Sequence, residues 1–231
     1  MNDAENIDIL ECDHKSYVLQ EYSTLNMIFK DAYLLFIECV NESQIQLKNG
    51  NEKLFNRIFL MQTNKANGDI RTIYHALLNG YYATAESLFR EVNDSIEKIA
   101  FASQFPHEME YLLKGKLKSK EVRKRLKKEN IPTVISNKGW GKISQMKHAE
   151  FSQIANYGQK VNNYSILKFH PTVDDNYIDG VFIMLIGFLS SICAHYYEYV
   201  NSIIDEKPGI IDFEKRIKKL SQFILKASIQ E

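Results

Sequence analysis

The stretch that most constrains the fold of this chain runs from Ile70 to Ala102. Apolar residues recur through it every three or four positions, which is the spacing of one buried helix face. An Asn-Gly pair at 79–80 interrupts the pattern, and glycine accepts the left-handed backbone that ends a helix. The stretch therefore predicts a pair of amphipathic helices, joined by a tight turn, at the centre of a helical bundle.

Two charged residues of this stretch, Arg90 and Asp94, lie four positions apart beside the apolar stripe. Residues at this spacing are neighbours on a helix surface. An exposed pair contributes only about 0.3–0.5 kcal/mol, whereas removing one partner of a buried pair costs about 3–5 kcal/mol. Two interpretations remain open: a clamp between packed helices, or part of a ligand or RNA pocket.

The rest of the chain predicts an all-α bundle of long helices. With only four prolines and ten glycines, and no long run of alternating residues, nothing demands a sheet. Residues 1–13 form a polar tail, and 14–231 a single domain with a basic insertion at 107–141, which holds two short helices broken near 115–119 and then a loop. A second long connection covers 158–176. The other predicted helices span 16–47, 52–78, 81–103, 142–157, 177–204 and 212–227.

The most apolar run, Val181–Cys193, is shorter than the roughly 20 residues that span a bilayer. It predicts a buried core helix and no membrane partner. The three cysteines are far apart and form no CxxC, so a disulfide framework is not expected and a reducing cytoplasm fits. Cys39 and Cys193 lie in apolar helical runs and are interpreted as small buried hydrophobic residues.

A basic run at 114–128 contains a single acidic residue, although the formal net charge of the chain is zero. Any attraction for polyanions is therefore local to this run. It has no interleaved aromatic residues to stack on bases, so contacts would be to a nucleic-acid backbone. The alternative is a solvated helix face. The candidate nucleic-acid-binding residues are Lys116, Lys118, Lys120, Arg123, Lys124, Arg125, Lys127 and Lys128.

The histidines show no HExxH motif and no metal-ligand spacing, and the phosphate-binding and hydrolase motifs GxxxxGK[ST], GxGxxG and GxSxG are missing. We therefore expect no metal and no cofactor. His170 lies in the loop KFHPT ahead of a long helix, where it either has a functional role or stabilises the turn. His195 lies in an apolar helix and is expected to be a hydrogen-bonded core residue.

The block from Gly80 to Asp94 resembles the core helix pair of an uncharacterised bacterial family related to HEPN domains. Gly80, Ala85, Leu88, Arg90 and Asp94 follow in order the glycine, alanine, leucine, arginine and acid of that family. The resemblance covers residues 50–200 and implies a HEPN-like bundle.

The chain departs from this family at its catalytic positions. Family members continue with Leu-Ser-x-x-x-His, whereas here FSQIAN places Asn156 at the histidine position, and an amide cannot transfer protons near neutral pH. HEPN ribonucleases also use an arginine and a histidine with four to six residues between them. Arg71 and His75, with three residues between them, fall one short.

The leading hypothesis is a cytoplasmic, homodimeric, non-catalytic or regulatory component of a bacterial defence or toxin–antitoxin-type system. The resemblance implies a protein partner from such a system and, as a further partner, RNA. The alternative is a metal-independent ribonuclease with a composite site at a homodimer interface. Its candidate catalytic residues are Arg90, Asp94, His170 and Asn156, next to the basic run.

Overall fold

The computed structural model describes residues 3–49, 54–131, 134, 158–161, 164–167, 175–203 and 212–229. Within them the chain is all-α, as predicted, apart from one short hairpin. Strands β1 (Gly158–Val161) and β2 (Tyr164–Leu167) pair antiparallel in this hairpin, with Gly158 opposite Leu167. The sequence predicts only a connection there.

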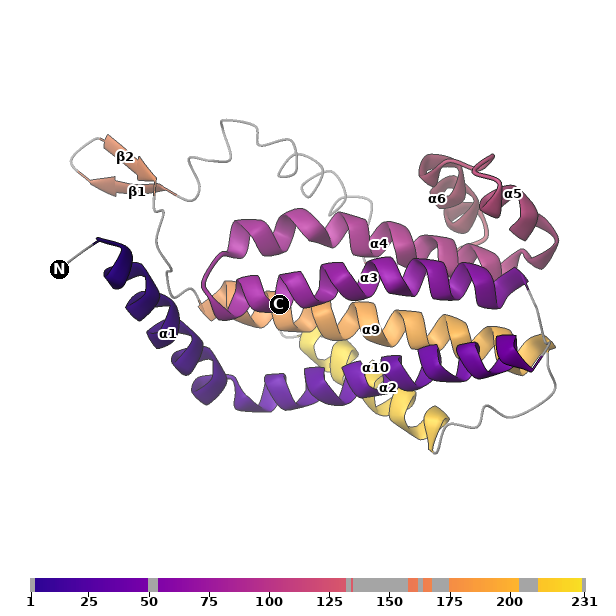
Figure 1. The fold of residues 1–231 in the computed structure, drawn as a ribbon, viewed down its shortest axis with the longest axis horizontal. Coiled ribbons are helices and arrows are strands. Elements are labelled where there is room, and N and C mark those ends of the chain that lie inside the picture. Colours follow the sequence, from indigo (N-terminus) through magenta and orange to yellow (C-terminus); the bar gives the residue numbers. More distant parts are fainter. Residues whose placement is uncertain are drawn as a thin grey trace.

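Four long helices lie side by side and enclose the core (Figure 1). They are α2 (Ser23–Lys48), α3 (Leu54–Leu78), α4 (Tyr82–Gln104) and α9 (Asp175–Ile203). A further helix, α10 (Phe213–Ile229), crosses the outside of α2 and α9. Its Phe213 and Leu220 are buried against them, so α10 covers the seam between these two helices.

The turn between α3 and α4 confirms the prediction made from Asn79 and Gly80. Gly80 has φ 76°, in the left-handed region that favours glycine. The amide of Tyr81 donates to the carbonyl of Ala76 at 2.8 Å, and that of Gly80 donates to Leu77 at 3.2 Å. These are the two hydrogen bonds of a Schellman motif, which ends α3 and lets α4 return along it.

The N-terminal region differs from the predicted polar tail, because helix α1 runs over Asp3–Glu21. The predicted helix at 16–47 is instead divided at Tyr22, whose φ and ψ of −102° and 25° are not helical. No proline or glycine marks this break. A tertiary contact accompanies it: Tyr17 and Tyr22 both donate hydrogen bonds to Asp175 Oδ1 at the start of α9, at 2.8 and 2.6 Å. The division of the chain into domains stays a prediction.

A buried histidine holds α1 to the bundle. His14 is 4% exposed, and its Nδ1 lies 3.0 Å from the carbonyl of Leu78 while its Nε2 lies 2.8 Å from the hydroxyl of Tyr82. The two partners flank the Gly80 turn, so α1 docks against the end of the α3–α4 pair. The sequence marks His14 by no motif.

The core helix α9 contains the apolar run Val181–Cys193, whose burial is confirmed. The apolar part of α9 is longer than this run: Tyr177–Ser202 is long and apolar enough to span a membrane by length and composition alone. Most of that segment packs inside the bundle, against α2 and α4. Cys39 and Cys193 are both fully buried, as expected.

Candidate nucleic-acid interface

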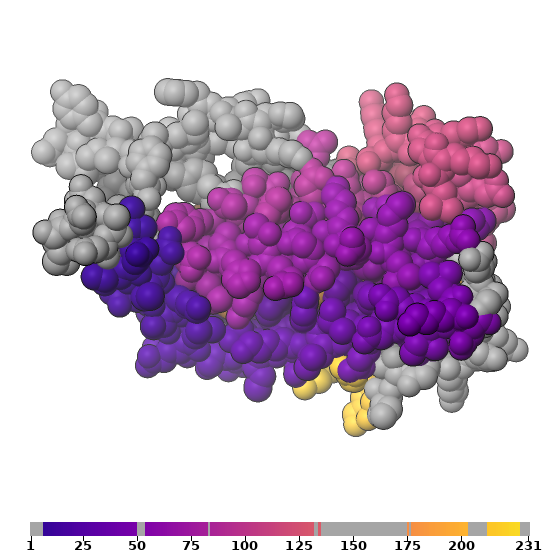
Figure 2. Space-filling view, in the orientation of Figure 1, coloured from indigo at the N-terminus to yellow at the C-terminus, as the bar shows by residue number. Residues whose placement is uncertain are grey.

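The basic run forms a small helical appendage at one end of the bundle (Figures 1 and 2). After α4 the chain continues through the 3₁₀ turn η1 (Pro106–Glu108), α5 (Met109–Leu113) and α6 (Ser119–Lys128). The break between two short helices confirms the prediction from sequence. Val122 and Leu126 are fully buried, because α6 lays this apolar side against α4.

An ion cluster fixes α6 to α4. Arg123 binds the carboxylate of Glu97 with two nitrogens, Nε to Oε1 at 2.8 Å and Nη2 to Oε2 at 3.0 Å. The same Nη2 also donates to Asp94 Oδ1 at 3.0 Å. Bidentate binding of a carboxylate by a guanidinium gives two parallel charge-assisted hydrogen bonds, which are among the strong ones in proteins. The cluster therefore holds the appendage in one orientation.

Glu97 is the most buried charged residue of this cluster, with a side chain only 1% exposed. Burial raises the pKa of its carboxyl, and hydrogen bonding and charge from Arg123 act in the opposite direction. Asn93, also buried, donates from Nδ2 to Glu97 Oε1 at 3.0 Å. Both oxygens of Glu97 are thus hydrogen-bonded, and the ionised form depends on Arg123.

A second ion pair and a helix cap complete the attachment of the appendage. Arg125 Nη1 binds Glu108 Oε1 of η1, which ties α6 to the turn that leaves α4. At the start of α6, Glu121 accepts a hydrogen bond from the backbone amide of Lys118 at 2.8 Å. This satisfies one of the amides that a helix N-terminus leaves unpaired.

Of the remaining cations of the run, Lys114 forms an ion pair with Glu110 of α5 at 2.7 Å, and the other six are exposed. Four exposed lysines lie on the side of α6 opposite Val122 and Leu126, and two more lie in the preceding turn. We call these six the lysine face: Lys116, Lys118, Lys120, Lys124, Lys127 and Lys128. One of them, Lys116, has its amino group 5.8 Å from the ring centroid of Tyr111.

The structure thus divides the eight predicted nucleic-acid-binding residues into two groups. Arg123 and Arg125 are anchors that bind carboxylates of α4 and η1. The six lysines form the exposed surface. Sequence reasoning missed Glu97 as the partner of the run. The available signal was the position of Arg123 beside the apolar residues of an amphipathic helix, which places it against the neighbouring element.

Both residues of the predicted pair, Arg90 and Asp94, lie on α4. Asp94 binds across to α6, through Arg123, and its side chain is 16% exposed. Arg90 is half-buried on the same helix. Asp94 therefore joins two packed helices, which agrees with the interpretation as a clamp. Its partner across the contact is Arg123, 29 positions later in the chain.

The other predicted residues are only partly covered by the structure. His170, Asn156 and the helix predicted at 142–157 lie outside the described residues. His195 is buried, and its Nδ1 lies 3.1 Å from Glu198 Oε2, which confirms a hydrogen-bonded core histidine. Arg71 and His75 are exposed on α3.

The chain matches no known family model, no curated protein and no solved structure.

Proposed function

We propose that this chain is a non-catalytic, RNA-binding component of a bacterial defence or toxin–antitoxin-type system, built on a HEPN-like bundle. The observation that carries the proposal is the lysine face, a concentration of exposed positive charge on a chain of zero net charge. Such a patch is the electrostatic footprint of a phosphate-binding surface. Cytoplasmic location, a homodimer and a protein partner belong to the same proposal.

The geometry of α6 favours an extended phosphate backbone as the ligand. A helix of ten residues is about 15 Å long, and its four exposed lysines are distributed along that length. Flexible ammonium groups act as point charges that suit phosphates without fixing a base sequence. The lysine face itself contains no aromatic residue, so we propose binding to the backbone of single-stranded RNA with little sequence preference.

The role of Asp94 supports a non-catalytic function. Its carboxylate is tied to Arg123 in the contact between α4 and α6, together with the buried carboxylate of Glu97. A carboxylate held in this way orients the appendage and is poorly placed to move a proton from a substrate. The role we assign to this cluster is therefore presentation of the lysine face.

The test is fluorescence anisotropy with a labelled single-stranded RNA of about 20 nucleotides, a length chosen to exceed a typical single-strand binding site. The variant changes Lys120, Lys124, Lys127 and Lys128 to glutamine. The control variant changes four exposed lysines elsewhere and removes the same charge: Lys15, Lys30, Lys215 and Lys218.

We expect the α6 variant to lose at least about tenfold in affinity, and the control to lose much less, because counterion release requires direct contact. Equal affinities for both variants would refute the proposed surface. The same RNA is then examined on a denaturing gel. Cleavage by the wild-type protein would refute the non-catalytic role and favour the ribonuclease alternative.

A further inference from the structure

A cleft lies between α2 and α10, far along the chain from the appendage. Its volume is about 310 Å³, within the range of small-molecule sites. The first half of α10 closes one end of it: Phe213 packs edge-on against Tyr197, with ring centroids 5.4 Å apart, and Arg216 binds Glu38 of α2. Towards its C-terminus α10 is less buried, and Leu225 is 63% exposed.

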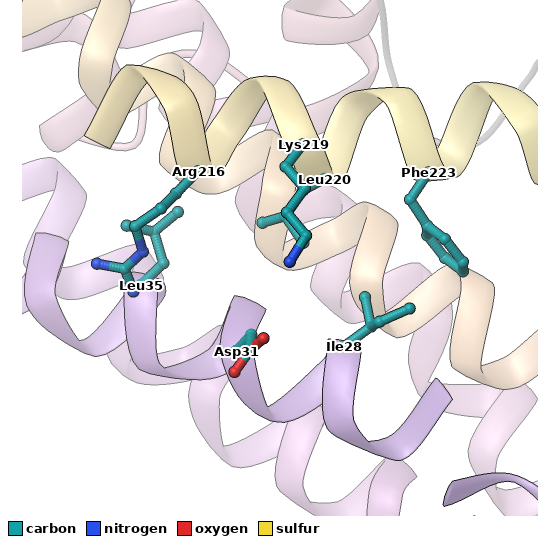
Figure 3. A pocket seen from close by; sticks show the side chains of 7 residues that line it. All are labelled: Ile28, Asp31, Leu35, Arg216, Lys219, Leu220 and Phe223. Atoms are coloured by element: carbon teal, nitrogen blue, oxygen red, sulfur yellow. The ribbon is translucent and has the colours of Figure 1, made fainter. Parts of the chain in front are cut away.

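The walls of the cleft are mostly apolar. Ile28 and Leu35 contribute from α2, and Leu220 and Phe223 from α10. In Figure 3, Phe223 faces Ile28 at one end, while Leu35 lies beside Arg216 at the other. Leu35 is fully buried, whereas Ile28 and Phe223 are only half-buried. The apolar surface near Phe223 is therefore accessible to a ligand.

Two opposite charges face each other across the middle of the cleft. The amino group of Lys219 points from α10 towards the carboxylate of Asp31 on α2 (Figure 3). Within the described part of the chain, neither side chain forms an ion pair or a hydrogen bond with the other or with a third residue. Arg216 provides a second cation at the same wall, and its bond to Glu38 uses one of several guanidinium donors.

Two other cavities offer no comparable arrangement. The groove between α2 and α3, of about 400 Å³, is lined only by apolar and uncharged polar side chains. The depression between α4 and α9 has Glu86 as its one charged lining residue. Of these three cavities in the described part of the chain, only the cleft between α2 and α10 has a carboxylate opposite two cations beside an apolar wall.

From this arrangement we infer that the cleft binds a free α-amino acid with an apolar side chain. Its ammonium group binds Asp31, and its carboxylate binds Lys219 and Arg216. The side chain lies between Ile28 and Phe223. A zwitterion fits because it supplies a partner for each charge, and hydrogen bonds between ionised groups are the strong ones. This site is independent of the proposed RNA-binding function.

The charges exclude simpler ligands of similar size. An apolar carboxylic acid would satisfy Lys219 and Arg216 but would place its own negative charge near Asp31. An apolar amine would satisfy Asp31 and face two cations. Each analogue thus leaves at least one charged group of the cleft without a partner and brings its own charge close to a like charge.

The experiment is isothermal titration calorimetry of the full chain with L-phenylalanine and L-leucine. The comparison ligands are 3-phenylpropionate, which lacks the ammonium group, and phenethylamine, which lacks the carboxylate. We expect saturable one-to-one binding of at least one amino acid, and binding of both analogues weaker by about tenfold or more, the effect of losing one charged contact. Absence of saturable amino-acid binding, or equal binding of either analogue, would overturn the inference.

Variants then locate the site. Asp31→Asn and Lys219→Met should each weaken amino-acid binding by about tenfold. Asp31→Asn should leave 3-phenylpropionate binding unchanged or stronger, because it removes a repelling charge. The control is Lys218→Met, an exposed lysine on the same helix that does not line the cleft. Equal losses in the Lys218 and Lys219 variants would contradict the site, and circular dichroism checks that each variant is folded.

Discussion

Arg123 is the residue whose removal tests the architecture of the appendage most severely. Glu97 is 1% exposed, and Arg123 supplies the only cation that binds it within the described chain. In an Arg123→Gln variant, Glu97 must either remain as a bare buried charge, at a cost of about 3–5 kcal/mol, or take up a proton. Burial already raises the pKa of this carboxyl above its ordinary value, and loss of Arg123 raises it further.

Protonation of Glu97 sets an upper limit on the loss of stability in Arg123→Gln. Keeping a carboxyl of unfolded pKa 4.5 neutral at pH 7 costs about 1.36 kcal/mol for each of 2.5 pH units, or about 3.4 kcal/mol. The folded variant holds a proton that the unfolded chain releases above pH 4.5, so its stability falls as pH rises. We therefore expect Arg123→Gln to lose up to about 3 kcal/mol at pH 7 and less than about 1 kcal/mol at pH 5.

Urea unfolding followed by circular dichroism at the two pH values measures this difference. Hydrogen exchange of α6 shows whether the appendage opens before the bundle does. The control is Arg125→Gln, since Arg125 is 47% exposed and its ion pair should contribute no more than about 1 kcal/mol. Adding Glu97→Gln to Arg123→Gln should abolish the pH dependence. A loss that is equal at pH 5 and pH 7, or equal to that of Arg125→Gln, would refute the reasoning.

Three further predictions concern the bundle. Gly80→Ala should lose about 1 kcal/mol or more, because the left-handed backbone disfavours alanine, whereas Gly68→Ala, inside α3 with open space around it, should stabilise by about 0.5–1 kcal/mol; urea midpoints that shift the same way would contradict this. His14→Phe should lose about 1–3 kcal/mol in the same assay, since the carbonyl of Leu78 and the hydroxyl of Tyr82 each lose a hydrogen bond with His14, and an unchanged midpoint would show that α1 is not held by these bonds. A thiol reagent should react with Cys12 alone in the native protein and with all three cysteines in urea, because the other two are fully buried and burial raises the pKa of Cys39; native labelling of a second cysteine would refute this burial.

Local sequence signals predict much of this fold. The 3.6-residue spacing of apolar residues indicates the long helices, and Asn79-Gly80 predicts the turn between α3 and α4. The break at Tyr22 could not be predicted in this way, because no helix breaker marks it and the hydrogen bonds beside it go to Asp175, which is remote in sequence. Residues 1–13 were expected to be a tail for a similar reason: α1 is held by contacts of His14 with Leu78 and Tyr82, which are also remote in sequence.

The candidate sites depend even more on tertiary contacts. The sequence marks the basic run, but not that Arg123 is an anchor while Lys124 is exposed, since that distinction requires the position of α4. Glu97 looks like any surface acid of an amphipathic helix until α6 covers it. The cleft is a stronger case, because Asp31 and Lys219 meet only after α10 has folded back across α2.

The central claim is that the lysine face binds RNA by contacting its phosphates, and the salt dependence of binding tests it most directly. The slope of log K against log salt for single strands is about −0.7 per phosphate contacted. If each of the four α6 lysines contacts one phosphate, their replacement should reduce the slope by about 2.8, while the control variant should keep the wild-type slope. A slope that is the same in the wild type and the α6 variant would contradict the claim.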